Sequence, residues 1–389
     1  MIRAEGPTSL GRRLVRATYA RSGAMGTDFP LLESDIADSV TLSRVTPIRS
    51  SRDKPLLIGW VTTPPALGSG GHTTMFRMIN ALESAGHSCV LFLYDRYFGD
   101  MEEHEAIIRR GWPTIRARVR DARKGIDEVD ACVATSWQTA HVMAKRSSDR
   151  LPRFYFIQDF EPFFYARGPE YALAEDTYRF GFHCIALGHM VAEQLGSIGV
   201  SCDTVEFGCD TTVYSEIGSS MEKRAGVVFY TRPGVERRGY HLGVLALREF
   251  HRCHPDQEIH VYGSPPGDLG FPATRHARLT PPQLNHLYNR TIAGLALSFT
   301  NISLVAEEML AAGTIPVIND SADARSDLPN PNAVWARPTP QGIAEALGAV
   351  VSDPSLEGRA RVAASSVRPD NWKRTGDDVV RIIEHGTFE

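Results

Sequence analysis

The sequence predicts an α/β protein made of two domains, each a parallel sheet covered by helices. Short apolar runs of strand length alternate with longer segments whose apolar residues recur at helical spacing. The alternation pauses at a polar stretch, 217–224, and then resumes with the same pattern. The length of 389 residues suits two domains of ordinary size.

The composition is that of a soluble globular protein, with 42% hydrophobic and 23% charged residues. A net charge of −4 gives no reason to expect nucleic acid as a partner. The six cysteines are scattered without a CxxC pair, which favours reduced thiols over disulfides or a zinc site. No run approaches the ~18 apolar residues of a membrane span, and no signal-peptide pattern follows the start. We therefore expect a cytoplasmic protein, either soluble or peripheral to a membrane.

Residues 1–54 form an N-terminal arm that precedes the first predicted strand. Its first two dozen residues contain five arginines and one glutamate. One interpretation is peripheral contact with anionic lipid at the inner face of the cell membrane. A helix packed on the first domain, or a disordered segment, is the other interpretation.

The first domain is expected over residues 55–216, beginning with a strand at Pro55–Val61. The loop that follows contains Gly70 and Gly71, and a helix and a second strand are expected after it. These glycines do not form the dinucleotide fingerprint GxGxxG, which disfavours a nicotinamide site. They either allow a ligand to approach the backbone or form a tight strand-to-helix turn. Residues 101–124 are predicted as a broken helix.

The run QDFEPFFY follows the strand predicted at Arg153–Gln158. Carboxylates among aromatic rings suit a carbohydrate, because rings stack on C–H faces and acids accept hydrogen bonds from hydroxyl groups. The candidate acceptor-binding residues are Gln158, Asp159, Glu161 and Tyr165. Asp159 and Glu161 are also catalytic candidates. Alternatively, Asp159 caps a helix ahead of Pro162, and the rings belong to an inter-domain core.

The second domain is expected over residues 225–368, after a linker at 217–224. Its first strand, Gly226–Tyr230, is followed by the basic run TRPGVERRG. Arg232 and Arg238 are candidate ligand-binding cations, and Arg237 is an alternative for the second position. A solvated basic turn would also explain this run.

The segment 293–319 predicts a strand, a polar turn, a helix from about Leu304 to Ala312, and another strand. A helix N-terminus at the carboxyl end of a parallel strand offers free N–H groups and a positive dipole end to phosphates. The candidate donor-binding residues here are Thr300, Asn301, Ile302, Ser303, Leu304 and Glu308. An ordinary strand–helix–strand unit with a surface glutamate is the alternative.

This segment resembles the donor-site motif of retaining, family 4-like GT-B glycosyltransferases, Glu-Gly-Phe-Gly-Leu-x-x-x-Glu-Ala-x-Ala-x-Gly-x-Pro-Val. The matching positions are Leu304, Glu308, Ala311, Gly313, Pro316 and Val317, with one extra residue before the proline. The family's first glutamate falls on Thr300, so that carboxylate is missing. The run TN-x-SL-V-x-EM and the earlier QDxEPxF are similar to a branch of polysaccharide rhamnosyltransferases that use dTDP-rhamnose.

The resemblance implies two Rossmann-like domains facing a central cleft, with a C-terminal helix, 369–389, crossing back to the first domain. It implies that Arg232 and Arg238 hold the donor pyrophosphate, that Glu308 holds the ribose, and that Gly70 and Gly71 lie near the diphosphate and the transferred sugar. Fixed cations would stabilise the charge on the leaving group, each by about 3 kcal/mol of barrier.

The expected reaction is transfer of a hexose, with L-rhamnose as the preferred sugar, onto a hydroxyl of a glycan or glycolipid. The leaving phosphate itself would deprotonate the acceptor on the same face. No cofactor and no metal are expected beyond the dTDP-sugar donor. Two other classes stay open: a nucleotide-sugar-modifying or NAD-dependent enzyme, and a degenerate GT-B protein that binds a glycan or a partner without catalysis.

Overall fold

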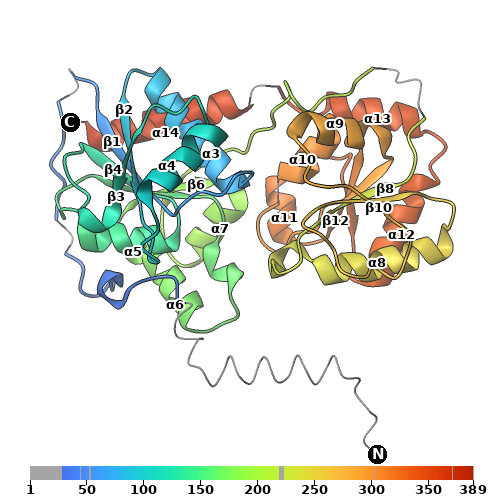
Figure 1. Ribbon diagram of the computed structural model, residues 1–389, viewed down its shortest axis with the longest axis horizontal. Helices are drawn as coiled ribbons and strands as arrows, with labels where there is room; N and C mark the ends of the chain where they lie inside the picture. The colour runs from blue at the N-terminus through green and yellow to red at the C-terminus, as the bar shows by residue number, and fades with distance from the viewer. Residues whose placement is uncertain are drawn as a thin grey trace, which may run out of the picture.

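The computed structural model describes residues 29–43, 45–51, 54–218, 223–302, 304–369 and 371–388. Two α/β domains lie side by side and are joined by extended segments (Figure 1). This arrangement confirms the predicted fold class. The first 28 residues, which carry the basic part of the arm, lie outside the described residues, as does Ser303. Among the described helices, none is long and apolar enough to cross a membrane.

The first domain contains a seven-stranded parallel sheet in the order β3-β2-β1-β4-β5-β6-β7. Its strands are β1 (Leu57–Thr62), β2 (Ser88–Leu93), β3 (Arg118–Asp121), β4 (Ala131–Ala134), β5 (Arg153–Ile157), β6 (His183–Leu187) and β7 (Cys202–Val205). The central strands are apolar on both faces, with one hydrophobic cluster on each side of the sheet.

Helices cover both faces of this sheet (Figure 1). They are α3 (Gly70–Ser84), α4 (Met101–Gly111), α5 (Trp137–Arg146), α6 (Pro169–Asp176) and α7 (His189–Ser197). Ser69, Asp100 and Ser136 cap the first three of these helices with their side chains. The predicted broken helix over 101–124 was wrong in its second half, which contains β3. Because β3 is a short edge strand with two arginines and an aspartate, it lacks the apolar pattern of a strand.

The second domain contains a six-stranded parallel sheet in the order β10-β9-β8-β11-β12-β13. The strands are β8 (Val227–Thr231), β9 (Ile259–Gly263), β10 (Thr274–Arg275), β11 (Ala293–Leu295), β12 (Ile315–Asn319) and β13 (Val334–Ala336). The helices are α8 (Tyr240–Cys253), α9 (Pro281–Arg290), α10 (Leu304–Ala311), α11 (Ala322–Asp327), α12 (Pro340–Val351) and α13 (Leu356–Ser365). One hydrophobic cluster forms the core of this domain.

The last helix, α14 (Asn371–Thr387), returns to the first domain, as predicted. It packs on α3, and its residues Val379 and Ile383 are fully buried in the first domain's core. Glu384 Oε1 lies 3.0 Å from His87 Nε2, and Thr375 Oγ1 donates a 2.7 Å hydrogen bond to the Glu206 carbonyl. The crossing helix therefore ties the end of the chain to the opening domain.

Gly208 lies where the chain leaves the first domain and passes under α14. A Cβ atom at this position would lie 2.5 Å from the backbone nitrogen of Trp372. We expect Gly208→Ala to lower the free energy of unfolding by about 1–3 kcal/mol, because the start of α14 must shift to make room. Urea unfolding measures this change. Gly196→Ala in α7 is the matched control, since a Cβ there meets no atom within 4 Å. Equal stability of the two variants would contradict the prediction.

Candidate active site

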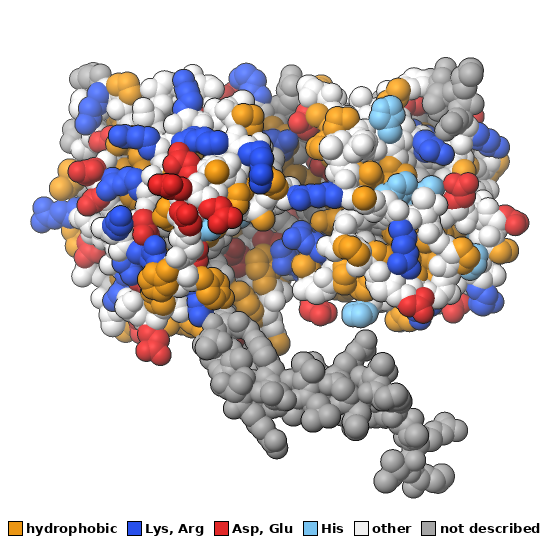
Figure 2. All heavy atoms as spheres, viewed as in Figure 1, with side chains coloured by type: hydrophobic (Ala, Val, Ile, Leu, Met, Phe, Trp, Pro, Cys, Tyr) orange, Lys and Arg blue, Asp and Glu red, His pale blue; other side chains and the backbone are white. Residues whose placement is uncertain are grey.

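The candidate site lies where the two domains face each other. The segment after β5 and the segment after β11 both leave the carboxyl edges of parallel sheets, where open α/β sheets bind ligands. The short helical turns η3 (Glu161–Phe164) and η5 (Glu236–Arg238) contact each other across the boundary. In the space-filling view, lysine and arginine side chains gather along the groove between the domains (Figure 2).

Asp159 of the first domain joins the predicted acceptor segment to the predicted donor segment. Thr300 Oγ1 donates a 2.9 Å hydrogen bond to Asp159 Oδ2, and the Asn301 backbone N–H donates to Oδ1 at 3.3 Å. Asn301 Nδ2 also donates to the Gln158 carbonyl at 2.6 Å. Asp159 is 7% exposed, and burial raises the pKa of its carboxyl even though two arginines and these hydrogen bonds oppose the shift.

Two arginines of η5 face this carboxylate. Arg237 Nε lies 3.9 Å from Asp159 Oδ2, and its guanidinium carbon lies 4.0 Å from the centre of the Phe164 ring. Arg238 donates a 3.0 Å hydrogen bond to Ser298 Oγ. Burial lowers the pKa of Arg238 to about 10, so the guanidinium stays cationic at neutral pH. The structure thus brings Arg238 and the alternative candidate Arg237 together.

Arg232 is near enough to this pair that, besides burial, its charge helps to lower the pKa of both arginines. Its side chain is exposed, and it donates a 3.4 Å hydrogen bond to the Tyr230 hydroxyl. The Asp159 carboxylate thus pairs with Arg237, whereas Arg232 contacts the Tyr230 hydroxyl. Because its side chain is exposed, Arg232 is accessible to a ligand that enters the groove from solvent.

Two buried polar atoms beside Asp159 have no hydrogen-bond partner within the described part of the chain. They are Arg237 Nε and Asn301 Oδ1, one donor and one acceptor. Buried polar groups in folded proteins are nearly always paired with protein, water or ligand. Their side chains come from the two loops that the sequence associates with donor binding. A polar ligand bound in the groove would supply partners for both atoms.

The loop after β11 is held by residues that the sequence analysis did not single out. Asn319, at the end of β12, accepts a 2.7 Å hydrogen bond from the Ser298 N–H and donates one of 2.7 Å to the Ser298 carbonyl. Ser298 Oγ in turn donates to the Asn301 carbonyl at 2.5 Å. The sequence feature that could have pointed to Asn319 is its position as a polar residue at the end of a buried apolar strand. These bonds fix the loop before any ligand arrives.

Leu304 begins α10 and Glu308 lies one turn later, while Ile302 is buried just before the helix. Burial raises the pKa of Glu308 to about 7, a shift that Arg77 of α3 opposes. Arg77 forms a 3.3 Å ion pair with Asp210 and stacks on the Trp372 ring. A cation of the first domain thus lies near the proposed ribose-binding carboxylate, which the sequence alone did not indicate.

Glu161 and Tyr165 point into the first domain. The Glu161 carboxylate accepts hydrogen bonds from the Trp137 N–H, at the start of α5, and from the Tyr155 hydroxyl at 3.1 Å. Tyr165 accepts a 3.1 Å hydrogen bond from Trp137 Nε1. In this structure both side chains hold the loop that carries Asp159. The alternative role for Asp159, capping the helix that contains Pro162, is wrong: Phe160 is at the N-cap position of η3, which has no side-chain cap hydrogen bond.

Gly70 and Gly71 begin α3 and are exposed. A Cβ on Gly71 would lie 3.6 Å from Gln158 Oε1, so this loop reaches the acceptor segment, whereas Gly70 has open space around it. Arg278 of the second domain donates a hydrogen bond to the Leu67 carbonyl in the same loop. The glycine loop therefore lies at the groove between the domains.

A second contact joins the domains further along. Asp327 Oδ1 accepts hydrogen bonds from the backbone N–H groups of His189 at 2.5 Å and Met190 at 3.1 Å, at the start of α7. Asp323 accepts a 3.0 Å hydrogen bond from Gln194 Nε2.

Within the described residues there is no group of three or more His, Cys, Asp and Glu side chains placed to hold a metal.

The Glu161 side chain should make the free energy of unfolding depend on pH. Burial raises its pKa to about 8, above the ordinary 4.5, so the native state keeps a proton that the unfolded chain releases. Stability contributed by this group is therefore present below pH 4.5 and lost as the pH rises through about 8. Between pH 5 and 8.5 we expect the free energy of unfolding to fall by about 4 kcal/mol less in Glu161→Gln than in the wild type. Urea unfolding at both pH values measures it; equal losses in variant and wild type would contradict the assignment.

Two family models match this chain, and they describe the two halves of one protein. The model of the WsaF N-terminal domain matches residues 114–189, and that of the WsaF C-terminal domain matches residues 225–348. The second match includes the arginines of η5 and the loop before α10.

Solved structures match over both domains. HepE of Anabaena, solved in complex with UDP-glucose, has a TM-score of 0.61 at 15% identity, covering 85% of this chain and 98% of that one. WaaG, a glycosyltransferase involved in lipopolysaccharide biosynthesis, has a TM-score of 0.61 at 11% identity, covering 84% and 99%. The chain has the GT-B fold. Identities of 15% and 11% define the fold of this GT-B protein but not its substrates.

The curated relative is longer than this GT-B protein. The O-antigen biosynthesis protein RfbC of Myxococcus xanthus is 31% identical over 337 residues, which are 82% of this chain and 26% of that protein. The chain thus spans about a quarter of the length of this relative.

Proposed function

We propose that this protein is a glycosyltransferase of bacterial surface-polysaccharide synthesis, which moves a hexose from a nucleoside-diphosphate sugar onto a hydroxyl of a glycan or glycolipid. The observation that carries the proposal is that two buried polar atoms, Arg237 Nε and Asn301 Oδ1, have no hydrogen-bond partner among the described residues and lie beside a carboxylate of the other domain. RfbC, named for O-antigen biosynthesis, and WaaG, named for lipopolysaccharide biosynthesis, support the substrate class.

In this proposal Arg237 and Arg238 bind the donor pyrophosphate, with Arg232 at the mouth of the groove. The N–H groups at the start of α10 add their dipole to the same phosphates. Glu308 accepts a hydrogen bond from the ribose, which for a deoxyribose donor is its 3′-hydroxyl. The two cations stabilise the charge that grows on the diphosphate as the bond to the sugar breaks.

We propose that transfer retains the configuration of the sugar. The bond from the sugar's anomeric carbon to the diphosphate breaks, and the electron pair leaves with the phosphate oxygen. The acceptor oxygen forms its bond on the same face, and its proton passes to that phosphate oxygen. Asp159 orients a hydroxyl of the acceptor or of the donor sugar, because its carboxylate lies between the loops of the two domains.

For the donor we propose dTDP-L-rhamnose, on the resemblance of residues 300–309 and 158–163 to rhamnosyltransferase sequences. HepE was solved with UDP-glucose, so UDP-sugars are the natural comparison. We also propose that turnover needs no metal ion, so that EDTA leaves the rate unchanged.

The test is release of nucleoside diphosphate from a panel of dTDP-rhamnose, UDP-glucose and GDP-mannose, with lipid-linked O-antigen precursors as acceptors. Faster release from dTDP-rhamnose than from the other two donors, dependent on an acceptor, is the expected result. Preference for another donor would discard rhamnose and keep the transferase. No release from any donor, with NAD-dependent turnover instead, would overturn the proposal.

We further propose that the protein works at the inner face of the cell membrane, where the basic residues of segment 1–28 contact anionic lipid. Cosedimentation with phosphatidylglycerol vesicles should then fall when these 28 residues are removed. Equal cosedimentation of the full and shortened chains would contradict this location for the arm.

A further inference from the structure

The loop 95–100, which follows β2, presents two neighbouring aromatic rings to solvent. Tyr97 is 69% exposed and Phe98 is 66% exposed. Large apolar side chains that gather on a surface mark interaction sites more often than single ones do. Neither ring belongs to the candidate active site described above.

The loop is built to hold these rings in place. The Asp95 carboxylate, only 8% exposed, accepts hydrogen bonds from the N–H groups of Tyr97 at 2.8 Å and Gly99 at 2.9 Å, and pairs with His104 Nε2 at 2.9 Å. Phe98 has a φ angle of 59°, in the left-handed region that a phenylalanine rarely adopts. Backbone strain of this kind persists where the surrounding contacts impose it, and it gathers at functional sites.

Guanidinium groups stack on both rings. The guanidinium carbon of Arg96 lies 4.7 Å from the Tyr97 ring centre, and that of Arg123 lies 4.5 Å from the Phe98 ring centre. Arg123 is fixed by a 2.8 Å ion pair with Asp121. Each ring therefore has one face supported by a cation while the residue remains largely exposed.

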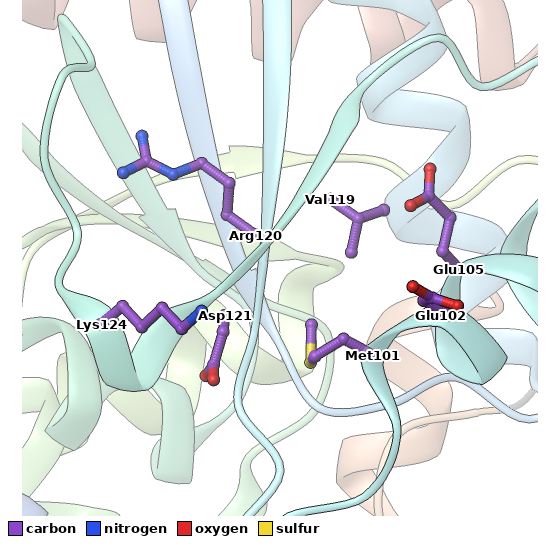
Figure 3. Close-up of a pocket in the computed structure, with 7 residues that line it drawn as sticks. All are labelled: Met101, Glu102, Glu105, Val119, Arg120, Asp121 and Lys124. Carbon is purple, nitrogen blue, oxygen red and sulfur yellow. The ribbon is translucent and has the colours of Figure 1, made fainter.

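A pocket of about 380 Å³ adjoins this loop. Its lining residues are Met101, Glu102, Glu105, Val119, Arg120, Asp121 and Lys124. The close-up shows Glu102 and Glu105 of α4 on one side, Asp121 and Lys124 on the other, and Met101 between them (Figure 3). Asp121 connects the pocket to the Phe98 ring through Arg123.

The chemistry of this surface suits a neutral, polyhydroxylated ligand. The pocket has three carboxylates and two cations, and Asp95, Arg96 and Arg123 beside the rings bring the net charge of the surface to zero. The surface therefore has no excess positive charge to attract an anionic membrane. Carboxylates and cations side by side offer acceptors and donors to hydroxyl groups, and exposed rings stack on the C–H faces of sugars.

We propose that Tyr97, Phe98 and the adjoining pocket form a subsite for the glycan acceptor, away from the transferred sugar; this inference rests on the proposed function. β2 ends at the same edge of the sheet as β1 and β5, whose loops carry Gly71 and Asp159. It lies three strand spacings from β5, roughly 14 Å. An oligosaccharide with its reacting end at Asp159 can extend along this edge to the loop.

The test compares the wild type with the double variant Tyr97→Ala/Phe98→Asn. Asparagine tolerates the left-handed backbone, so the loop keeps its shape. Leu245→Ala on α8, at a 47% exposed position in the second domain, is the matched control. The probes are an array of bacterial surface polysaccharides and their oligosaccharides, including rhamnose-containing ones, and phosphatidylglycerol–phosphatidylethanolamine vesicles. Melting temperatures and the thermal shift with dTDP and UDP are measured on all three proteins.

We expect the wild type and the control to bind at least one arrayed glycan, and the double variant to bind it at least tenfold more weakly. The nucleotide shifts should be equal in all three. Absence of glycan binding by the wild type, unchanged binding by the double variant, or loss of vesicle binding in its place would overturn the subsite. If glycan binding is lost in the double variant while no protein responds to a nucleotide, the transferase proposal fails and the glycan subsite stands.

Discussion

Replacing Arg238 by alanine is expected to lower kcat/KM by about 10²- to 10³-fold with little change in fold. The side chain is half-buried, its guanidinium remains cationic at neutral pH, and it donates a 3.0 Å hydrogen bond to Ser298 Oγ. A positioned cation of this kind contributes about 3–4 kcal/mol to the stabilisation of charge that develops in the transition state. Initial rates of nucleoside-diphosphate release, measured over a range of donor concentrations, give the loss.

Two controls accompany this variant. Arg238→Lys keeps the charge and loses the fork-shaped guanidinium, so its rate should lie between those of the wild type and Arg238→Ala. Arg252→Ala removes an exposed arginine of α8 in the same domain and should leave the rate unchanged. A rate for Arg238→Ala within threefold of the wild type would remove Arg238 from the donor site.

Asp159→Asn is expected to separate binding from turnover. Asparagine keeps the size of the side chain and one acceptor oxygen for Thr300 or Asn301, but it removes the negative charge that faces Arg237. Because that charge repels the donor diphosphate, nucleotide binding should tighten by roughly fivefold, about 1 kcal/mol. Turnover should fall by about 10²-fold, since the carboxylate no longer orients a hydroxyl.

Isothermal titration with dTDP and steady-state kinetics measure the two effects on the same preparation. Weaker nucleotide binding together with normal turnover would contradict the role given to Asp159. A matched change on the same loop is Glu161→Gln, whose carboxylate points into the first domain. It should alter stability with pH while leaving nucleotide affinity near the wild-type value.

The alternation of strand and helix could be predicted because buried parallel strands are continuous apolar runs. The unit from β11 to β12 is the clearest case, with Gly313 in the left-handed conformation just after α10. β3 could not be predicted, because its pairing with β2 is set by tertiary structure and its sequence, RVRD, is polar. Local propensity carries little information about such edge strands.

For the candidate site, the sequence singled out segments that the fold brings together, but it did not indicate which of their atoms meet. Asp159 and Thr300 are 141 residues apart, and no local pattern relates them. Glu161 and Asp159 are two residues apart in the same acidic and aromatic run, yet one points into the domain and the other across the groove. The role of Asn319 in holding Ser298 depends on neighbouring strand ends, which only the folded sheet brings together.

The central claim is that the groove beside Asp159 binds a nucleoside diphosphate through the arginines of η5. Its most direct test is the thermal shift of the wild type and of Arg238→Ala with dTDP, UDP, GDP, ADP and NAD. A ligand at 100 times its dissociation constant stabilises a fold by about 2.7 kcal/mol. We predict a shift with dTDP in the wild type that is lost in Arg238→Ala. No shift with any nucleoside diphosphate, or a shift that persists in Arg238→Ala, would contradict the claim.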